Sequence, residues 1–439
     1  MEKRDFLGTM PVRKLLWKMA APSIVGVMAY NLYNLFDTLF ISAGAGMDAV
    51  GGVSVSFPLF LFLSAVSSTL GSGGACVLSR ALGEKDYEGA NRAAAQTFGA
   101  FYAVAVCVTI FGLLFLDELL YAMGITEELL PYAREYTGII LLGAVTSTGF
   151  SNLIRAEGDG KYAMYIWVIP VTANVVLDVL FIFGFHWGVK GAAGATVLSQ
   201  MISMGMSIYF FYFSGRSALR LSWRHFIPNP RCLREILLTG LPSFVQMSGA
   251  AVSIVVVNRF LKQYGSLPIN VYGLVSKVNA FFVFPITGLA QGMQPIIGYN
   301  EGARKRKRVR ETLQAASFAA AGYGAAVFVV TLAVSEWMMR LFTSDAAAVE
   351  LGGHVLAIVN AGLVFSGLQY VLATYLQAVG KKYRALACTA CNYVVCFIPL
   401  VVVLNQVCGL EGIWYALPLS AALAAGVAFV MVKQSWRRV

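Results

Sequence analysis

Two carboxylates lie inside long runs of apolar residues, and they are the side chains of this sequence best suited to chemistry. Asp37 belongs to the apolar run near 15–42, and Asp178 belongs to the run near 163–185. A carboxylate in the middle of a membrane-spanning helix costs about 2.5–3.5 kcal/mol on insertion scales. An asparagine could join two helices at a lower cost, so we favour a functional role for both aspartates over a purely structural one.

Further polar side chains accompany the two aspartates at helical spacing. Tyr33 and Asn34 precede Asp37 by one helical turn, and Asn174 stands in the same relation to Asp178, so each set lies on one face of its helix. A third apolar run carries another polar stripe, formed by Thr196, Gln200 and Ser203. All three stripes fall in the first half of the chain.

These groups together could bind a small cation. Two carboxylates, an amide and a hydroxyl supply the oxygen ligands that a hard cation such as Na⁺ prefers. Two carboxylates that lie close together also resist simultaneous ionisation, and such a pair could share a proton. We therefore predict that the first half of the chain binds Na⁺ or H⁺, and the residues alone leave both ions open.

The composition places these groups in a membrane. Of the 439 residues, 58% are hydrophobic and 13% are charged, whereas soluble domains carry about 25% charged residues. The formal net charge of +11 is spread over short breaks between apolar runs, and this distribution argues against a nucleic-acid partner. Cys388 and Cys391 form a CxxC without a second pair or a nearby histidine, so we predict that they hold no metal or redox group.

About twelve segments reach the length of roughly 20 mainly apolar residues that a spanning helix needs. They lie near 15–42, 50–78, 93–116, 131–154, 163–185, 191–213, 235–260, 269–298, 312–334, 350–376, 384–407 and 411–432. Lys and Arg concentrate in alternate breaks between these segments, and only Arg134, Lys190, Arg259, Lys262 and Arg340 fall in the other breaks. The positive-inside rule then predicts a multi-pass protein of the cell membrane with both termini in the cytoplasm.

The chain also repeats itself. In the longest repeated block Gly73 aligns with Gly292 and Gly83 with Gly302, while WKMAAPS ending at Ser23 matches LLTGLPS ending at Ser243. A third block, GVKGAAGATVLS from Gly188, matches GLEGIWYALPLS from Gly409. Three blocks in one order predict two pseudo-symmetric six-helix lobes around a central cavity. We expect an N-terminal lobe at 1–213, a cytoplasmic linker at 214–234 and a C-terminal lobe at 235–439.

Blocks in both halves resemble the multidrug and toxic compound extrusion (MATE) family. In the first half these are LGEKDYEGANRA, RAEGDGKYAMY at 155–165 and NVVLDVLFIF at 174–183. In the second half they are QGMQPIIGYNEGA at 291–303 and LQAVGKKYRA at 376–385. The QGMQPIIGYN block and the lysine before it, Lys277, are most similar to the MepA-type bacterial branch.

The resemblance implies export of amphipathic, often cationic, organic molecules in exchange for inward flow of Na⁺ or H⁺, by alternating access. It places Asp37, Asn174, Asp178 and Thr196 at the family's cation site. It also marks Pro22 as the bend point of a mobile first helix. We expect no cofactor, contact with membrane lipids, and a monomer.

Six polar residues are candidates to line the cavity that holds the transported molecule: Tyr33, Asn34, Asn152, Gln200, Lys277 and Gln291. Lys277 stands alone in the eighth segment, where it could face the cavity or extend to the membrane surface. Asn152 and Gln291 could equally join helices. The basic stretch RKRKRVR at 304–310 is predicted to set orientation and contact lipid, in preference to binding nucleic acid.

Two alternatives to a drug exporter deserve comparison. A flippase for a lipid-linked precursor, from the same superfamily, would usually carry several arginines in its cavity and extra spans. A membrane-embedded enzyme would need an Asp-rich diphosphate motif or a histidine cluster, and the sequence has neither. It also lacks a GxxxxGK[ST] loop for ATP. We therefore predict an ion-coupled transporter and not an enzyme.

Overall fold

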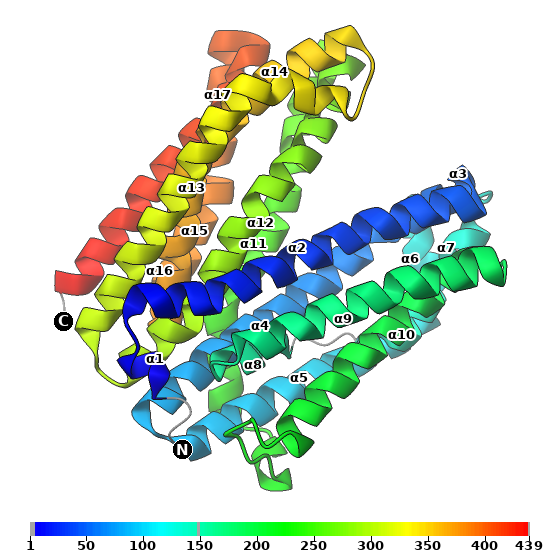
Figure 1. Cartoon of the computed structure of the whole chain (residues 1–439). Helices are drawn as coiled ribbons and strands as arrows, with labels where there is room; N and C mark the ends of the chain where they lie inside the picture. The colour runs from blue at the N-terminus through cyan, green and yellow to red at the C-terminus, as the bar shows by residue number, and fades with distance from the viewer. Residues whose placement is uncertain (1–4, 147–149, 438–439) are drawn as a thin grey trace. The chain divides into compact units, whose positions relative to one another are not determined.

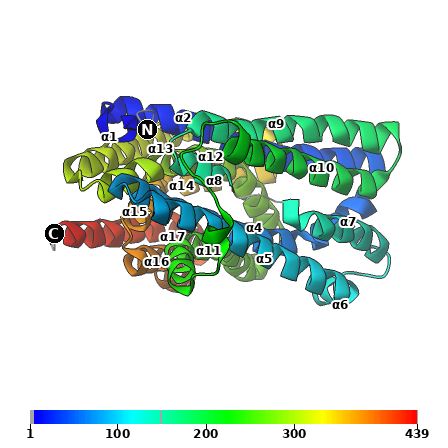
Figure 2. The same ribbon diagram turned by 90° about the horizontal axis from the view of Figure 1, so that it is seen from below.

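The computed structural model describes residues 5–146 and 150–437, apart from the side chains of Asn34, Leu35, Ala45, Met47 and Arg437. Within these ranges the chain forms helices and no strands (Figures 1 and 2). The all-α fold class predicted from the sequence is confirmed.

In the described ranges the first half of the chain contains ten α-helices, two of which are extended by π-helical turns. They are α1 (Phe6–Thr9), α2 (Val12–Ala45), α3 (Met47–Val55), α4 (Phe57–Glu84), α5 (Tyr87–Leu114), α6 (Leu116–Ala122), α7 (Leu130–Gly143), α8 (Ser151–Ala156), α9 (Gly160–Asp178) and α10 (Gly188–Ile208). The π-helical turns are η3 (Val179–Gly184) after α9 and η4 (Tyr209–Phe213) after α10. A short 3₁₀ helix, η2 (Ala144–Thr146), follows α7, and another, η5 (Trp223–Phe226), lies in the connection to the second half.

The second half is built from longer helices. They are α11 (Pro230–Leu261), α12 (Ser266–Gly302), α13 (Arg306–Arg340), α14 (Ala346–Ala361), α15 (Leu363–Ala378), α16 (Lys382–Ala390) and α17 (Phe397–Arg437). The 3₁₀ turn η6 (Lys262–Tyr264) follows α11, and the π-helical η7 (Cys391–Cys396) joins α16 to α17.

Nine helices in the described ranges are long and apolar enough to cross a membrane, and the bent pair α14 and α15 forms a tenth candidate. One of the nine, Lys382–Trp436, has 55 residues. At 1.5 Å per residue a helix of this length measures about 80 Å, more than twice the roughly 30 Å hydrocarbon core. Its backbone leaves the helical region at Gly409 (φ 59°, ψ −135°), so it supplies two spans. Helix α10 with its extension η4 is not among these candidates in the described ranges, and the number of about twelve spans stays a prediction.

The helices pack into two compact units. The first consists mainly of Val25–Gly240, and the second of Phe6–Ile24 together with Leu241–Val439. Two helices therefore change unit along their length, because α2 leaves the second unit after Ile24 and α11 leaves the first after Gly240. In α2 the change comes shortly after Pro22, and in α11 it comes shortly before Pro242. The repeats predict boundaries at 213 and 235. The packing differs from this prediction because the first part of α2 belongs to the second unit and the first part of α11 belongs to the first unit.

Glycines let the exchanged helix segments approach their neighbours closely. In the first unit, a Cβ at Gly73 on α4 would meet the backbone oxygen of Ile236 on α11. In the second unit, a Cβ at Gly292 on α12 would lie 2.5 Å from the Cα of Ala20 on α2. The sequence repeat aligns Gly73 with Gly292, so the same contact is built once in each unit from the same small residue.

Backbone conformation supports the internal duplication independently of residue identity. Four pairs of residues at matching places in the two halves have positive φ: Gly46 and Gly265, Lys85 and Arg304, Gly158 and Gly380, and Gly188 and Gly409. Lys85 and Arg304 carry side chains that rarely adopt this conformation, so their agreement is informative. Each ends a long helix at the same point of the repeat, after α4 and after α12.

The connection after α10 is fastened to the first unit. The Glu157 carboxylate accepts hydrogen bonds from Ser217 Oγ and from the Ala218 backbone N–H, both at 2.8 Å. Further along, Gln96 Nε2 donates to the backbone oxygen of His225 at 2.7 Å. The segment predicted to be a linker is therefore held on helices of one unit and is not a free tether.

Candidate cation site

Three helices of the first unit bring the predicted cation ligands together. Asp37 comes from α2, Asn174 and Asp178 come from the last turn of α9, and Thr196 comes from α10. Helices α9 and α10 lie side by side in both views (Figures 1 and 2). Asp178 is fully buried, and Asp37 exposes only 7% of its surface. The sequence predicts that these residues lie on one face of each helix, and the packing of the three helices brings those faces together.

An apolar layer holds the helices in register beside these groups. Ile41 of α2 packs in one cluster with Tyr136 and Ile140 of α7, Ile182 of η3 and Ala192 of α10. Ile41 lies one helical turn beyond Asp37, and Ile182 lies one turn beyond Asp178. Their burial therefore fixes which way the two aspartates face.

Hydrogen bonds connect the ligands to one another. The Tyr33 and Thr196 hydroxyl oxygens lie 3.0 Å apart. In the amide orientation that satisfies its surroundings, Asn174 Nδ2 donates to Asp178 Oδ2 at 2.9 Å, and its oxygen accepts from the Thr196 backbone N–H at 3.3 Å. Three of the four residues predicted to form the site, Asn174, Asp178 and Thr196, are thus linked by hydrogen bonds, and Tyr33 connects α2 to them.

The two carboxylates keep oxygens free for a ligand. Asp37 Oδ1 and Asp178 Oδ1 are both buried and have no hydrogen-bond partner in the described part of the chain. Ile41 and Ile182, one turn beyond each aspartate, pack in the same cluster, so the two carboxylates lie on neighbouring helices, where like charges repel each other. A buried carboxylate oxygen without a donor is costly, and a bound cation or proton removes that cost. The donor set, which combines carboxylate, amide and hydroxyl oxygens, fits Na⁺ or H⁺.

Tyr136 is a neighbour of the site that the sequence did not single out. It lies on α7, is buried, and packs in the same cluster as Ile41 and Ile182, which lie one turn beyond Asp37 and Asp178. Its sequence surroundings give no signal for this role, because Tyr132 precedes it by one turn and the apolar Ile139 and Ile140 follow it by one turn. Only the packing of α7 against α2 reveals the relationship.

The other candidate residues of the first unit occupy different surroundings. Gln200 lies one turn after Thr196 on α10, and its Oε1 accepts a hydrogen bond of 3.4 Å from Thr146. Asn152 on α8 accepts from Arg155 Nη1 at 3.0 Å, which places it beside a buried guanidinium. The side chain of Asn34 lies outside the described residues.

Lys277 and Gln291 belong to α12 in the second unit. Lys277 is exposed, and Gln291 is half-buried. Neither is part of the cluster around Asp37 and Asp178.

The second unit carries apolar residues where the first has its polar cluster. The sequence repeat aligns Thr196 with Leu417, and Leu417 packs against a buried cluster that includes Val257, Val401 and Trp414. The position that carries a hydroxyl in the first unit is therefore apolar in the second.

The same architecture occurs in proteins of known class. The multidrug export protein MepA of Staphylococcus aureus (strain N315) is 26% identical over 434 residues, which are 98% of this chain and 96% of the relative. A crystal structure of MATE in the straight conformation shares 25% identity with a TM-score of 0.93, covering 99% of this chain and 98% of that one. A crystal structure of MATE in the bent conformation has a TM-score of 0.92 at 25% identity, covering 99% and 97%.

The sequence model of the MatE family matches residues 22–180 and 242–403. These two matches coincide with the two repeated halves, and together they cover most of the chain. The first contains Asp37, Asn174 and Asp178. The resemblance that the sequence motifs indicated is confirmed, and the chain belongs to the MatE family of membrane transporters.

Proposed function

We propose that this chain exports amphipathic, often cationic, small molecules in exchange for Na⁺ or H⁺. The names of its relatives, a multidrug export protein and MATE transporters, support the substrate class. The observation that carries the coupling is the pair Asp37 and Asp178, both buried, each with one oxygen that has no hydrogen-bond partner in the described chain.

Ion binding and substrate export are coupled through the charge of this pair. With both carboxylates ionised, their repulsion and their burial disfavour a tightly closed cluster. A Na⁺ between them, or a proton on one of them, removes the repulsion and draws α2 toward α9 and α10. The ion-bound and ion-free states thus favour different packings of α2. An ion shifts the equilibrium between two conformations only if it binds one of them more tightly.

Helix α2 is suited to transmit this change. It is continuous from Val12 to Ala45, carries Pro22 within it, and packs in the second unit up to Ile24 and in the first unit from Val25. A proline removes one backbone hydrogen bond and permits a bend. Similar structures include one described as straight and one as bent. We propose that ion binding at Asp37 changes the bend of α2 at Pro22 and, with it, the room for substrate.

The transporter acts in the cell membrane as a monomer, with both termini in the cytoplasm and lipid around its helices. The distribution of Lys and Arg supports this orientation. The exported molecule then moves outward while the ion moves inward. No nucleic acid or cofactor takes part in this scheme.

The test is efflux of a fluorescent cationic dye from proteoliposomes, with the Na⁺ gradient and the proton gradient imposed separately. Wild-type protein should transport under at least one gradient. Asp178→Asn should lose gradient-driven transport while remaining folded. Asp48→Asn is the matched control, because Asp48 is an exposed residue of α3 in the same unit, and it should transport like wild type.

Two results would overturn the proposal. Transport by wild-type protein under neither gradient would reject ion exchange. Gradient-driven transport by Asp178→Asn at the wild-type rate would reject the role of the carboxylate pair and leave the family membership intact.

A further inference from the structure

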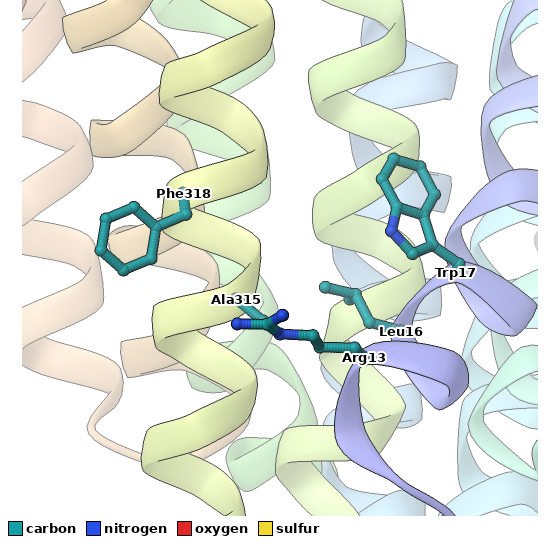
Figure 3. A pocket seen from close by; sticks show the side chains of 5 residues that line it. All are labelled: Arg13, Leu16, Trp17, Ala315 and Phe318. Atoms are coloured by element: carbon teal, nitrogen blue, oxygen red, sulfur yellow. The ribbon is translucent and has the colours of Figure 1, made fainter.

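A crevice on the second unit lies between the start of α2 and α13. It has a volume of about 240 Å³ and is lined by Arg13, Leu16, Trp17, Ala315 and Phe318 (Figure 3). Leu16 is almost fully buried and forms its floor, whereas Trp17 and Phe318 are 54% and 79% exposed. Figure 3 shows the Arg13 side chain reaching from α2 toward α13, with its guanidinium near Ala315. The crevice is therefore apolar except for one cation.

Three basic residues near the start of α2 are engaged within the chain. Lys305 donates to the Gly8 backbone oxygen at 3.0 Å, and Arg308 donates to that of Met10 at 2.7 Å. Lys18 lies over the ring of Phe6, 4.3 Å from its centre. Arg13, in contrast, makes no hydrogen bond or ion pair with any residue that the structure describes. No group of the described chain neutralises its charge.

The order of residues along the two helices favours a membrane-surface position for this charge. The candidate span of α2 begins at Val12, directly before Arg13, and that of α13 begins at Arg306. Tryptophan favours the boundary between headgroups and acyl chains, and Trp17 lies one turn inside Arg13. Phe318 lies 12 residues into α13, a rise of about 18 Å. A cationic group at the surface end is thus followed by apolar side chains toward the membrane interior.

We propose that this crevice binds one anionic phospholipid, with its phosphate at Arg13 and an acyl chain against Trp17 and Phe318. The guanidinium matches a phosphate in charge and donor geometry. The same charge disfavours the cationic molecules that the transporter is proposed to export. An uncharged apolar ligand would leave Arg13 unpaired beside it. The lipid would join α2 to α13 within the second unit.

The experiment counts lipids bound to the purified full chain by native mass spectrometry. Phosphatidylglycerol and phosphatidylcholine are added in separate titrations, and soluble glycerophosphate serves as a headgroup without acyl chains. Wild-type protein should retain one phosphatidylglycerol with a preference of about tenfold over phosphatidylcholine, the size expected of a charge-assisted hydrogen bond. Glycerophosphate should not compete at equal concentration, because the apolar contacts are required.

Arg13→Gln should lose the preference for phosphatidylglycerol. Lys14→Gln is the matched control, because it removes the same charge from the neighbouring exposed residue, which does not line the crevice. Ala315→Phe fills the crevice without changing any charge, so it should also lose the lipid. This second variant keeps the test decisive if Arg13→Gln fails to fold.

Equal loss in Arg13→Gln and Lys14→Gln would overturn the site in favour of diffuse attraction to a basic surface. An unchanged lipid count in Ala315→Phe would place the lipid elsewhere. Equal retention of phosphatidylglycerol and phosphatidylcholine by wild type would also overturn the proposal. None of these results depends on transport, so they leave the proposed function untouched.

Discussion

The hydroxyl oxygens of Tyr33 and Thr196 lie 3.0 Å apart and join α2 to α10. This bond lies one helical turn before Asp37 on α2, and Thr196 also meets Asn174 of α9 through its backbone N–H. Three helices are thereby connected around the two carboxylates by neutral groups. If ion binding changes the packing of α2, removing this bond should change the affinity for the ion.

Tyr33→Phe removes this bond while preserving the ring. A hydrogen bond of this kind contributes about 1 kcal/mol, so we expect the apparent affinity for the coupling ion to fall roughly fivefold. Dye efflux measured against ion concentration gives this value. Tyr165→Phe, at an exposed tyrosine of α9, is the control and should leave the affinity unchanged. A wild-type affinity in Tyr33→Phe would contradict the proposed link between α2 and the ion.

Asp178→Asn should stabilise the protein at the expense of coupling. The aspartate is fully buried with one oxygen unpaired in the described chain, and a charge in a span costs about 2.5–3.5 kcal/mol on insertion scales. We expect a higher melting temperature in detergent without the coupling ion. Asp48→Asn should not change it. A lower melting temperature would instead indicate that the carboxylate serves mainly to hold the helices together.

Gly73→Ala should destabilise the first unit. The added Cβ would collide with the Ile236 backbone oxygen, and such overpacking typically costs about 1–3 kcal/mol. Gly99→Ala on α5 is the matched control, because no atom lies within 4 Å of its added Cβ and alanine favours helix. Thermal unfolding should separate the two variants. Equal melting temperatures would show that α11 can shift to accept the methyl group.

Glu157→Ala should release the connection between the halves. It removes the acceptor for Ser217 Oγ and the Ala218 N–H, and hydrogen bonds to a charged group contribute about 1.5–3 kcal/mol. We expect faster cleavage by trypsin after Arg216 and Arg220, measured as the appearance of two half-size fragments. Glu84→Ala, at an exposed glutamate at the end of α4, should be cut at the wild-type rate. Unchanged cleavage in Glu157→Ala would mean that other contacts hold the segment.

Some features of this protein follow from its sequence alone. Low charge and long apolar runs determine a helical membrane protein, because only helices satisfy their own backbone hydrogen bonds in lipid. The repeated blocks predict the duplication, which the paired positive-φ residues Lys85 and Arg304 support. The stripe that joins Asn174 to Asp178 is visible because residues four apart share one helical face. These properties depend on the spacing of residues along the chain, which can be read directly from the sequence.

Other features were decided only by tertiary packing. The sequence shows no reason for α2 and α11 to pack partly in the other half's unit, since that depends on close approach at Gly73 and Gly292. It does not show that Tyr136 packs with Ile41 and Ile182 beside the aspartates. Nor does it show that Arg13 has no partner among the described residues while Arg308 is engaged. The physical reason is common to all three. Contacts between helices depend on how side chains far apart in the chain fill space together, and no spacing along one helix contains that information.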